Sequence, residues 1–250
     1  MPGDADIARI AALIGDPGRA RMLFALADGR ALPASVLAAE AQVAPSTASG
    51  HLSRLVDAGL LVAERQGRHR YFRVAAPDVV RVLEALAQIS PARPVTSLRQ
   101  GTRAQQVRAA RLCYDHVAGR LGVGIMGRLL ALGALEGGDG EHHPGHGGRD
   151  RLSARGSDID YVVTPGGEAL LRDLDVDLAS LHAGRRPVVR YRLDWSEQRH
   201  HLAGSLGAAL ADRFLVLGWI RRSPKSRALT VTDAGRAGLS AALGLTLAEA

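Results

Sequence analysis

The sequence predicts a mainly α-helical protein with short β-hairpins, arranged as two domains. Aliphatic residues and alanine supply most of the 46% hydrophobic content and aromatic residues supply only 4%, a composition that favours helices over a β-sandwich. Apolar residues recur at helical spacing through most of the N-terminal third. A chain of 250 residues is also long enough for two domains of ordinary size.

Four helices are predicted before residue 60. Two of them share the stretch Ile7 to Leu26, because its apolar spacing is interrupted at Asp16-Pro17-Gly18. A third covers residues 34–41, and a fourth begins at Pro45, a residue that suits the first position of a helix. The short turn at residues 42–44 between the last two predicts a helix-turn-helix.

The fourth helix has two unlike faces. Ala48, Leu52, Leu55 and Val56 are predicted to lie together on one face. Small hydroxyl residues early in the helix would let its N-terminal end enter a DNA major groove. The residues predicted to touch that groove are Ser46, Thr47, Ser49, His51 and Arg54. Gly59 then ends the helix as a C-cap.

Residues 61–74 are predicted to form a β-hairpin, because apolar residues alternate on either side of a turn at Gln66-Gly67-Arg68. Cationic side chains crowd the tip of this hairpin: Arg65, Arg68, His69 and Arg70. A cationic β-ribbon beside a groove-reading helix predicts salt-dependent contacts with the DNA backbone or minor groove.

A closing helix is predicted over residues 78–89, and its apolar stripe suits contact with a partner subunit. The next segment, residues 90–104, contains Pro91 and Pro94 and little periodicity, so we expect it to be a linker. These boundaries give a first domain at residues 1–89 and a second at residues 105–250.

The stretches GDPGRARML and APSTASGHLSRLVDAGLLVAERQGRHRYFRV, within residues 5–88, resemble the ArsR family of winged-helix repressors. The resemblance implies a homodimer with a recognition helix at residues 45–57, a wing at residues 61–74, and repression that a signal relieves. Two residues depart from the family pattern, Ala44 where a capping Ser is usual and Gly50 where Arg is common. Glycine inside a helix costs about 1 kcal/mol relative to alanine.

Many members of this family sense metals through cysteines on the helix before the recognition helix. Here that helix, ASVLAAEAQ, has no Cys, His or Asp. Soft-metal sensing at this position is therefore excluded, because Zn and thiophilic ions require thiolate or imidazole ligands. From the sequence we assign no metal site and no cofactor. We also expect no enzyme activity and assign no catalytic residue, because the chain has no nucleophile elbow, phosphate loop, dinucleotide fingerprint or H-E-x-x-H motif.

The second domain contains an internal repeat. HVAGRLGVGIMGRLLALGAL at 116–135 aligns without gaps with HLAGSLGAALADRFLVLGWI at 201–220, and about half of the positions are identical. YVVTPGGEALL at 161–171 likewise resembles LTVTDAGRAGL at 229–239. A helix, a glycine cap, a strand and T-x-x-G before another helix are typical of MarR-type winged-helix domains. We therefore predict a pseudo-symmetric, winged-helix-like C-terminal domain.

The repeat units, over about residues 110–174 and 195–245, are expected to place two helices that start near His116 and His201 opposite one another across a pseudo-twofold axis. This pairing would gather thiol, phenol and imidazole groups into an effector pocket or redox site. Its candidate residues are Cys113, Tyr114, His116, Trp195, His200 and His201.

Other interpretations of these residues stay open. The histidines can instead cap and buttress the repeated helices. Cys113, expected on a helix near Arg108 and Arg111, is either a redox sensor or a small buried residue. The glycine-rich insertion over residues 136–158 is either a transition-metal site or a surface connection. The possible ligands in that insertion are Glu141, His142, His143 and His146.

The net charge of +7 makes a polyanionic partner plausible, although an arginine-rich surface is also a common compositional effect. The single cysteine rules out an intramolecular disulfide and fits a reducing compartment. No apolar run approaches the ~18 to 20 residues of a membrane span, and the N-terminal residues do not resemble a signal peptide. We therefore expect a cytoplasmic protein with no membrane partner.

Together these features predict a sequence-specific regulator of transcription that binds double-stranded DNA. We expect a homodimeric repressor that responds to an unidentified signal, with the C-terminal domain serving as effector or dimerisation module and with a small molecule as one possible effector. The alternative is an enzyme or a small-molecule-binding protein that uses the winged helix as a structural adaptor.

Overall fold

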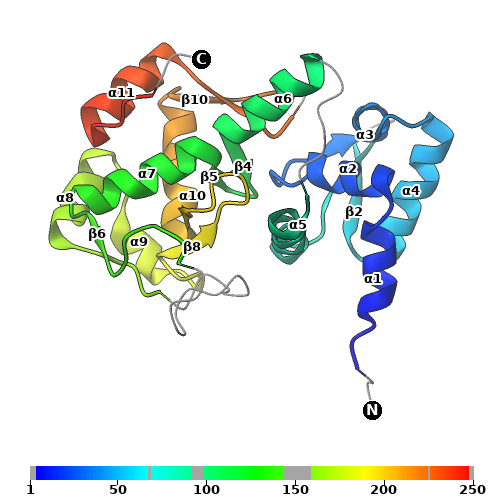
Figure 1. Ribbon diagram of the computed structural model, residues 1–250, viewed down its shortest axis with the longest axis horizontal. Coiled ribbons are helices and arrows are strands. Elements are labelled where there is room, and N and C mark those ends of the chain that lie inside the picture. The colour runs from blue at the N-terminus through cyan, green and yellow to red at the C-terminus, as the bar shows by residue number, and fades with distance from the viewer. Residues whose placement is uncertain (1–3, 67–68, 92–97, 144–158, 225, 248–250) are drawn as a thin grey trace. The chain divides into compact units, whose positions relative to one another are not determined.

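The computed structural model divides the chain into two compact units, Met1–Leu86 and Ala87–Ala250. The boundary falls inside helix α5 (Pro77–Ile89). In Figure 1 the helices and strands of unit 1 before α5 are blue to cyan, α5 is blue-green, and those of unit 2 after α5 are green to red. The structure describes residues 4–66, 69–91, 98–143, 159–224 and 226–247.

Unit 1 contains the four predicted helices: α1 (Ile7–Ile14), α2 (Pro17–Ala25), α3 (Ala34–Ala41) and α4 (Pro45–Asp57). The break before α2 has a local cause, because the Asp16 carboxylate accepts a hydrogen bond from the backbone N–H of Arg19 (2.9 Å) and so caps the helix. Gln42, with a φ of 58°, ends α3 in the left-handed conformation and turns the chain into α4. Helix α4 packs against α2 and α3, as a helix-turn-helix requires.

The hairpin of unit 1 consists of β2 (Leu61–Gln66) and β3 (His69–Val74), which pair antiparallel from Leu61↔Val74 to Gln66↔His69. Of the predicted turn, Gln66 is the last residue of β2, and residues 67 and 68 lie outside the described residues. A strand that the sequence analysis missed, β1 (Leu32–Pro33), pairs with the other edge of β3. Two residues are too few to show an alternating pattern.

Unit 2 alternates helices with short antiparallel strand pairs. Its elements are α6 (Leu98–Ala109), β4 (Arg111–Cys113), β5 (His116–Ala118), α7 (Gly119–Ala131), β6 (Leu135–Glu136), β7 (Val162–Val163), α8 (Pro165–Asp173), α9 (Leu178–Ala183), β8 (Arg190–Leu193), β9 (His200–Ala203), α10 (Gly204–Val216), β10 (Ile220–Arg222), β11 (Leu229–Val231) and α11 (Asp233–Leu243). The predicted linker at residues 90–104 is wrong from Leu98 onward, because helix α6 begins there. The prolines that suggested a linker end at Pro94, and good helix formers such as Arg, Gln and Ala dominate after Leu98.

The order hairpin, helix, strand pair and helix occurs twice in unit 2, once from β4 to α8 and once from β8 to α11. Thr164 and Thr232 cap the last helix of each half in the same way, each accepting a hydrogen bond of 3.0 Å from the glycine N–H three residues later. The two halves share a single apolar core. Duplication of an ancestral unit would produce this correspondence between the two halves, and it stays a prediction.

Each half packs its first helix against the hairpin of the other half, α7 against β9 and α10 against β5. Glycines permit the close approach of each helix to its own hairpin and leave room for the hairpin of the other half. A Cβ at Gly122 of α7 would lie 2.3 Å from the carbonyl oxygen of Val117 and 3.5 Å from the His201 Cβ. A Cβ at Gly207 of α10 would lie 3.2 Å from the His116 Cβ. Strands β5 and β9 consequently lie next to one another at the centre of unit 2.

Two predictions about local structure are wrong at this centre. His116 and His201 lie on strands β5 and β9, not on helices. The reason is Gly119 and Gly204, whose positive φ values of 77° and 86° break the helical conformation, so that each helix starts only there. Cys113, expected on a helix, lies on strand β4 and pairs with His116 across the hairpin.

Candidate functional site

The outer surface of α4 carries four of the five residues predicted to read a groove. Ser46, Thr47, Ser49 and Arg54 are all exposed. Ala48, Leu52 and Leu55 on the other side of the helix are buried in the core of unit 1. The helix thus presents three small hydroxyl groups and one guanidinium to a ligand.

His51, the fifth predicted contact, points back into unit 1. Its side chain is only 14% exposed, and its Nε2 lies 3.7 Å from an Asp16 carboxylate oxygen. Its Nδ1 lies 3.4 Å from the Arg19 guanidinium. This arrangement makes His51 a packing residue between α4 and the start of α2.

Arg19 is a structural residue that sequence analysis missed. Its guanidinium donates to the carbonyl oxygens of Ala12 (3.0 Å) and Leu13 (2.6 Å), near the C-terminal end of α1. The hydrogen bond from the backbone N–H of Arg19 lowers the pKa of Asp16, and the positive charge of the Arg19 guanidinium lowers it further by a smaller amount. Asp16, Arg19 and His51 together join α1, α2 and α4. The sequence predicts only one feature of this group: Asp16 directly before Pro17 is typical of a helix cap.

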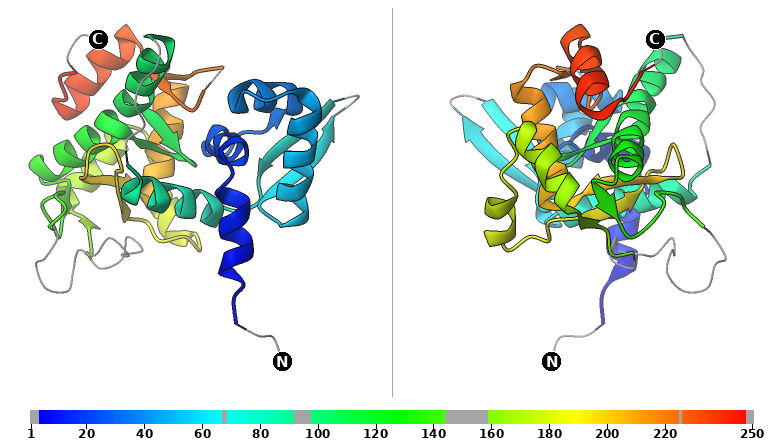
Figure 2. Two further views of the ribbon diagram at one scale, coloured as in Figure 1. Left: turned by 45° about the vertical axis from the view of Figure 1, so that its right-hand side comes forward. Right: turned by 90° about the vertical axis from the view of Figure 1, so that its left-hand side faces the viewer.

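The hairpin of β2 and β3 forms a ribbon that projects from the rest of unit 1 (Figure 2). Arg65 and Arg70 are exposed and directly paired across the two strands. Two like charges in such a pair are destabilising unless an anion compensates them. Arg73, in contrast, donates from its Nε to the Glu64 carboxylate (2.6 Å) and is already neutralised. Arg68 and the side chain of His69 lie outside the described residues.

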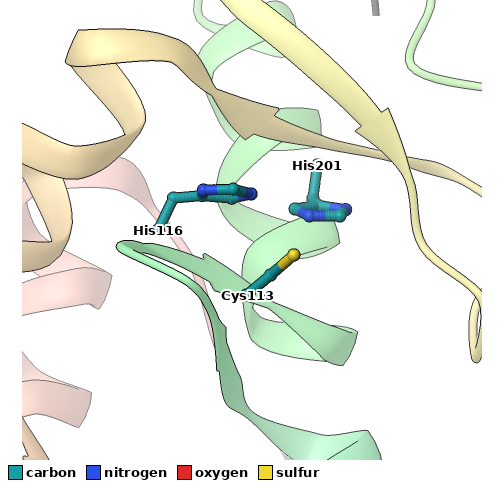
Figure 3. Close-up of side chains that lie close together, drawn as sticks. All are labelled: Cys113, His116 and His201. Carbon is teal, nitrogen blue, oxygen red and sulfur yellow. The ribbon is translucent and has the colours of Figure 1, made fainter. Parts of the chain in front are cut away.

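A second group of candidate residues meets at the centre of unit 2. The Cys113 sulfur and one ring nitrogen from each of His116 and His201 all lie within 4.8 Å of one another. The three residues are 3%, 3% and 1% exposed. Figure 3 shows the two imidazole rings nearly parallel with the sulfur directed toward them; the ring centroids are 5.2 Å apart.

Each of these histidines has a carboxylate behind it. Asp115 lies 3.1 Å from the Nδ1 of His116, and Asp194 lies 3.7 Å from the Nδ1 of His201. Neither the Nε2 of His116 nor either ring nitrogen of His201 has a hydrogen-bond partner among the described residues. Because a buried polar atom without a partner costs about 1–3 kcal/mol, this cluster requires an explanation.

The carboxylate of Asp194 is held from several sides. It accepts hydrogen bonds from the Arg111 guanidinium (2.9 Å), from the backbone N–H of Gly119 (2.6 Å) and from Ser196. Burial raises the pKa of Asp194, but Arg111 and the other partners outweigh this effect, so the pKa lies below its ordinary value. Burial lowers the pKa values of both His116 and His201, so the imidazoles are neutral at neutral pH.

The remaining predicted effector residues lie apart from this cluster or at its edge. The Trp195 ring lies beneath the Arg111 guanidinium, 4.7 Å from the ring centroid. Tyr114 occupies the turn between β4 and β5 with a φ of 63°. His200 lies within hydrogen-bonding distance of the Tyr161 hydroxyl (2.9 Å, measured to Nδ1), because successive residues of a strand point to opposite faces.

The cluster has little room for an organic ligand. A cavity of about 10 Å³ lies next to it, lined by Val117, Leu202 and neighbouring apolar residues of α7 and α10. This volume is at the lower limit for one water molecule. A cavity of about 330 Å³ lies elsewhere in unit 2, lined by Gln106, Arg221 and Arg222 among others.

In the predicted insertion, Glu141 pairs with Arg199, and the Nε2 of His143 lies 2.7 Å from Asp139. His142 is partly buried, and His146 lies outside the described residues. Among the described helices, none has the length and hydropathy needed to span a membrane.

The chain is similar to known regulators of transcription. A helix-turn-helix domain model matches residues 14–64. The HTH-type transcriptional regulator YdfF of Bacillus subtilis (strain 168) is 38% identical over 231 residues, which are 92% of this chain and 94% of the relative. CmtR of Mycobacterium tuberculosis (strain ATCC 25618 / H37Rv), also an HTH-type transcriptional regulator, is 39% identical over 83 residues, 33% of this chain and 70% of the relative.

The homodimeric winged helix-turn-helix domain Mb0332 of Mycobacterium bovis, described as a possible ArsR-family regulator, is 31% identical with a TM-score of 0.30, covering 36% of this chain and 88% of that structure. The similarity to YdfF extends over nearly the whole length of both chains. This protein therefore belongs to the HTH-type transcriptional regulators, and its first unit is the winged helix-turn-helix that the sequence predicted.

Proposed function

We propose that this regulator is a homodimeric repressor in which α4 reads a specific duplex and unit 2 receives the signal that releases it. One observation carries the proposal: the exposed side of α4 presents Ser46, Thr47, Ser49 and Arg54, and the ribbon of the same unit carries paired arginines. Small side chains let a helix approach base edges closely, and an arginine donates two hydrogen bonds to guanine.

The wing supplies the part of binding that does not depend on sequence. Arg65 and Arg70 repel one another in the free protein, and a phosphate placed between them would remove that repulsion. Contacts of this kind fix the position of a protein on the duplex without reading it.

The test is fluorescence anisotropy with the DNA upstream of the gene and with an unrelated duplex. Arg54→Ala should weaken binding to the preferred sequence by about 1–3 kcal/mol and hardly change binding to the unrelated one. Arg65→Ala and Arg70→Ala should weaken both alike. Arg73→Ala is the matched control on the same hairpin, because Glu64 already neutralises Arg73.

Absence of association with any duplex at low ionic strength would refute the proposal. Wild-type binding by the Arg54 and Arg65 variants would instead favour an adaptor role for the winged helix, with a small-molecule-binding or enzymatic unit 2.

Repression itself is measured with a reporter gene placed behind the upstream DNA. Expression of the reporter should rise when the gene that encodes this protein is deleted.

We propose that two copies of the chain associate through the apolar side of α5, because its apolar stripe leaves large hydrophobic side chains exposed. On this helix Val79 and Leu83 are buried, while Val82 and Leu86 are 46% and 39% exposed. A second copy of the chain would cover these side chains. Val82→Glu should shift the protein to monomers in sedimentation experiments, whereas Arg81→Glu on the polar side should not; a monomeric wild type would exclude this interface.

A further inference from the structure

The cluster of Cys113, His116 and His201 combines features that a purely structural group does not need. All three residues are at least 97% buried, and three of the four imidazole nitrogens of His116 and His201 have no hydrogen-bond partner among the described residues. A buried imidazole in an apolar core normally bonds through at least one nitrogen. His201 bonds through neither, although the Asp194 carboxylate lies 3.7 Å away.

We infer that Cys113, His116 and His201 bind a thiophilic divalent cation of the Zn²⁺ class, and that this ion is the signal received by unit 2. One sulfur and two imidazole nitrogens are ligands that Zn²⁺ and related ions prefer. The signalling part of this inference rests on the proposed function, whereas the binding site itself does not.

The distances fit a site that closes around its ion. A tetrahedral Zn²⁺ requires ligand atoms about 3.3–3.6 Å apart. The three ligand atoms now lie within 4.8 Å of one another, so each needs to move by an ångström or less. Rotation of the side chains supplies movements of this size without a change in the strands.

The two carboxylates occupy the positions expected behind metal-bound histidines. A metal-ligating imidazole usually donates its other N–H to a carboxylate, which orients the ring. Asp115 stands at the Nδ1 of His116 and Asp194 near the Nδ1 of His201, so the Nε2 atoms are the metal ligands in both cases. Arg186 holds Asp115 and Arg111 holds Asp194, which keeps both carboxylates in place.

Ion binding would connect the two halves of unit 2. Cys113 and His116 come from the hairpin β4–β5, whereas His201 comes from β9 of the other hairpin. When the ion binds, the thiol proton of Cys113 leaves to solvent and the thiolate completes a set of three protein ligands. Three protein ligands leave the fourth position of a tetrahedral ion to a donor from outside the chain. Binding of the ion therefore strengthens the connection between the two hairpins. A change of this kind in unit 2 is what an effector domain needs in order to signal that its ligand is bound.

The first experiment is a titration of chelator-treated, reduced full-length protein with Co²⁺. We expect one ion per chain, with a sulfur-to-cobalt charge-transfer band and the visible bands of a tetrahedral ion, and displacement of Co²⁺ by Zn²⁺. Cys113→Ser, nearly equal in volume, should abolish the charge-transfer band while circular dichroism stays unchanged. His143→Gln, at the exposed His143–Asp139 pair, is the matched control and should bind like the wild type.

Asp115→Asn tests the positioning role of the carboxylate. Loss of such an outer partner should weaken the affinity for Zn²⁺ 10–100-fold and leave the cobalt spectrum tetrahedral. Failure of folded wild-type protein to bind Co²⁺ through sulfur would overturn the site, and so would unchanged binding by Cys113→Ser.

The second experiment measures DNA affinity with and without Zn²⁺ by anisotropy. A change in affinity that Cys113→Ser removes supports the signalling role. An ion that binds stoichiometrically without changing DNA affinity would overturn the signalling role and leave the site standing. If the protein binds no duplex either with or without Zn²⁺, the proposed function fails, while the cobalt titration still decides the site.

Discussion

At the scale of single residues, the structure separates exposed side chains, which are the candidates for DNA contact, from side chains that hold the fold. Ser49 and His51 are two positions apart on α4, yet Ser49 is exposed and His51 packs against Asp16 and Arg19. In unit 2, Arg111 and Asp194 form an ion pair with no exposed surface. An ion pair of this kind is costly to form but more costly to break, because the remaining charge has no solvent.

His51→Ala should lower the free energy of unfolding of unit 1 by about 1 kcal/mol, because it removes contacts with Asp16 and Arg19. Ser49→Ala should leave stability unchanged within experimental error. Urea denaturation of both variants checks this difference. Equal stability of the two variants would return His51 to the groove-reading residues.

Asp194→Ala should destabilise unit 2 by about 3–5 kcal/mol, because Arg111 would keep a buried charge without its carboxylate. The matched control is Asp212→Ala on α10, where the carboxylate is exposed. Chemical denaturation followed by tryptophan fluorescence reports on unit 2, since both tryptophans, Trp195 and Trp219, lie in it. A cost below 1 kcal/mol would show that the pair is solvated in solution.

At the scale of helices, the same residue type has opposite roles in α4 and α7. A Cβ at Gly50 of α4 would meet no atom within 4 Å, so nothing in the packing requires glycine there. A Cβ at Gly122 of α7 would collide with the carbonyl oxygen of Val117. The first glycine only loosens its helix, whereas the second permits a close contact between the helix and the hairpins.

Gly50→Ala should therefore raise the free energy of unfolding of unit 1 by about 1 kcal/mol, and Gly122→Ala should lower that of unit 2. The measurement is thermal and urea denaturation of the two variants beside the wild type. Stabilisation by Gly122→Ala would contradict the packing of α7 against the hairpins.

At the scale of the whole molecule, the net charge of +7 favours association with a polyanion, and the paired arginines concentrate part of it on the wing. If two protomers each place Arg65 and Arg70 on phosphates, four contacts form. The logarithm of the affinity should then fall with the logarithm of salt concentration with a slope of about −3.6. Between 50 and 200 mM salt, this slope corresponds to a loss of roughly 10²-fold in affinity. Anisotropy at several salt concentrations measures the slope, and Arg65→Ala should reduce its magnitude; a slope near zero would contradict phosphate binding by the wing.

Much of unit 1 could be predicted because its signals are local. The helices α1 to α4 follow from apolar spacing, from Asp16 before Pro17 and from Pro45 after a short turn. Strand β1 could not be predicted, because its two residues form a strand only through pairing with β3. The internal repeat predicted that residues around His116 and His201 approach one another, but not that both lie on strands.

By itself the sequence determined the helices, the hairpin and the helix-turn-helix of unit 1, because spacing, caps and turn residues act over a few positions along the chain. Only the tertiary structure decided which polar side chains meet. It turned His51 inward, separated His200 from His201, and gathered Cys113, His116 and His201 into one buried cluster. These contacts depend on how segments that are distant in the sequence pack together. The residue pattern within one segment does not determine which side chains of another segment it will contact.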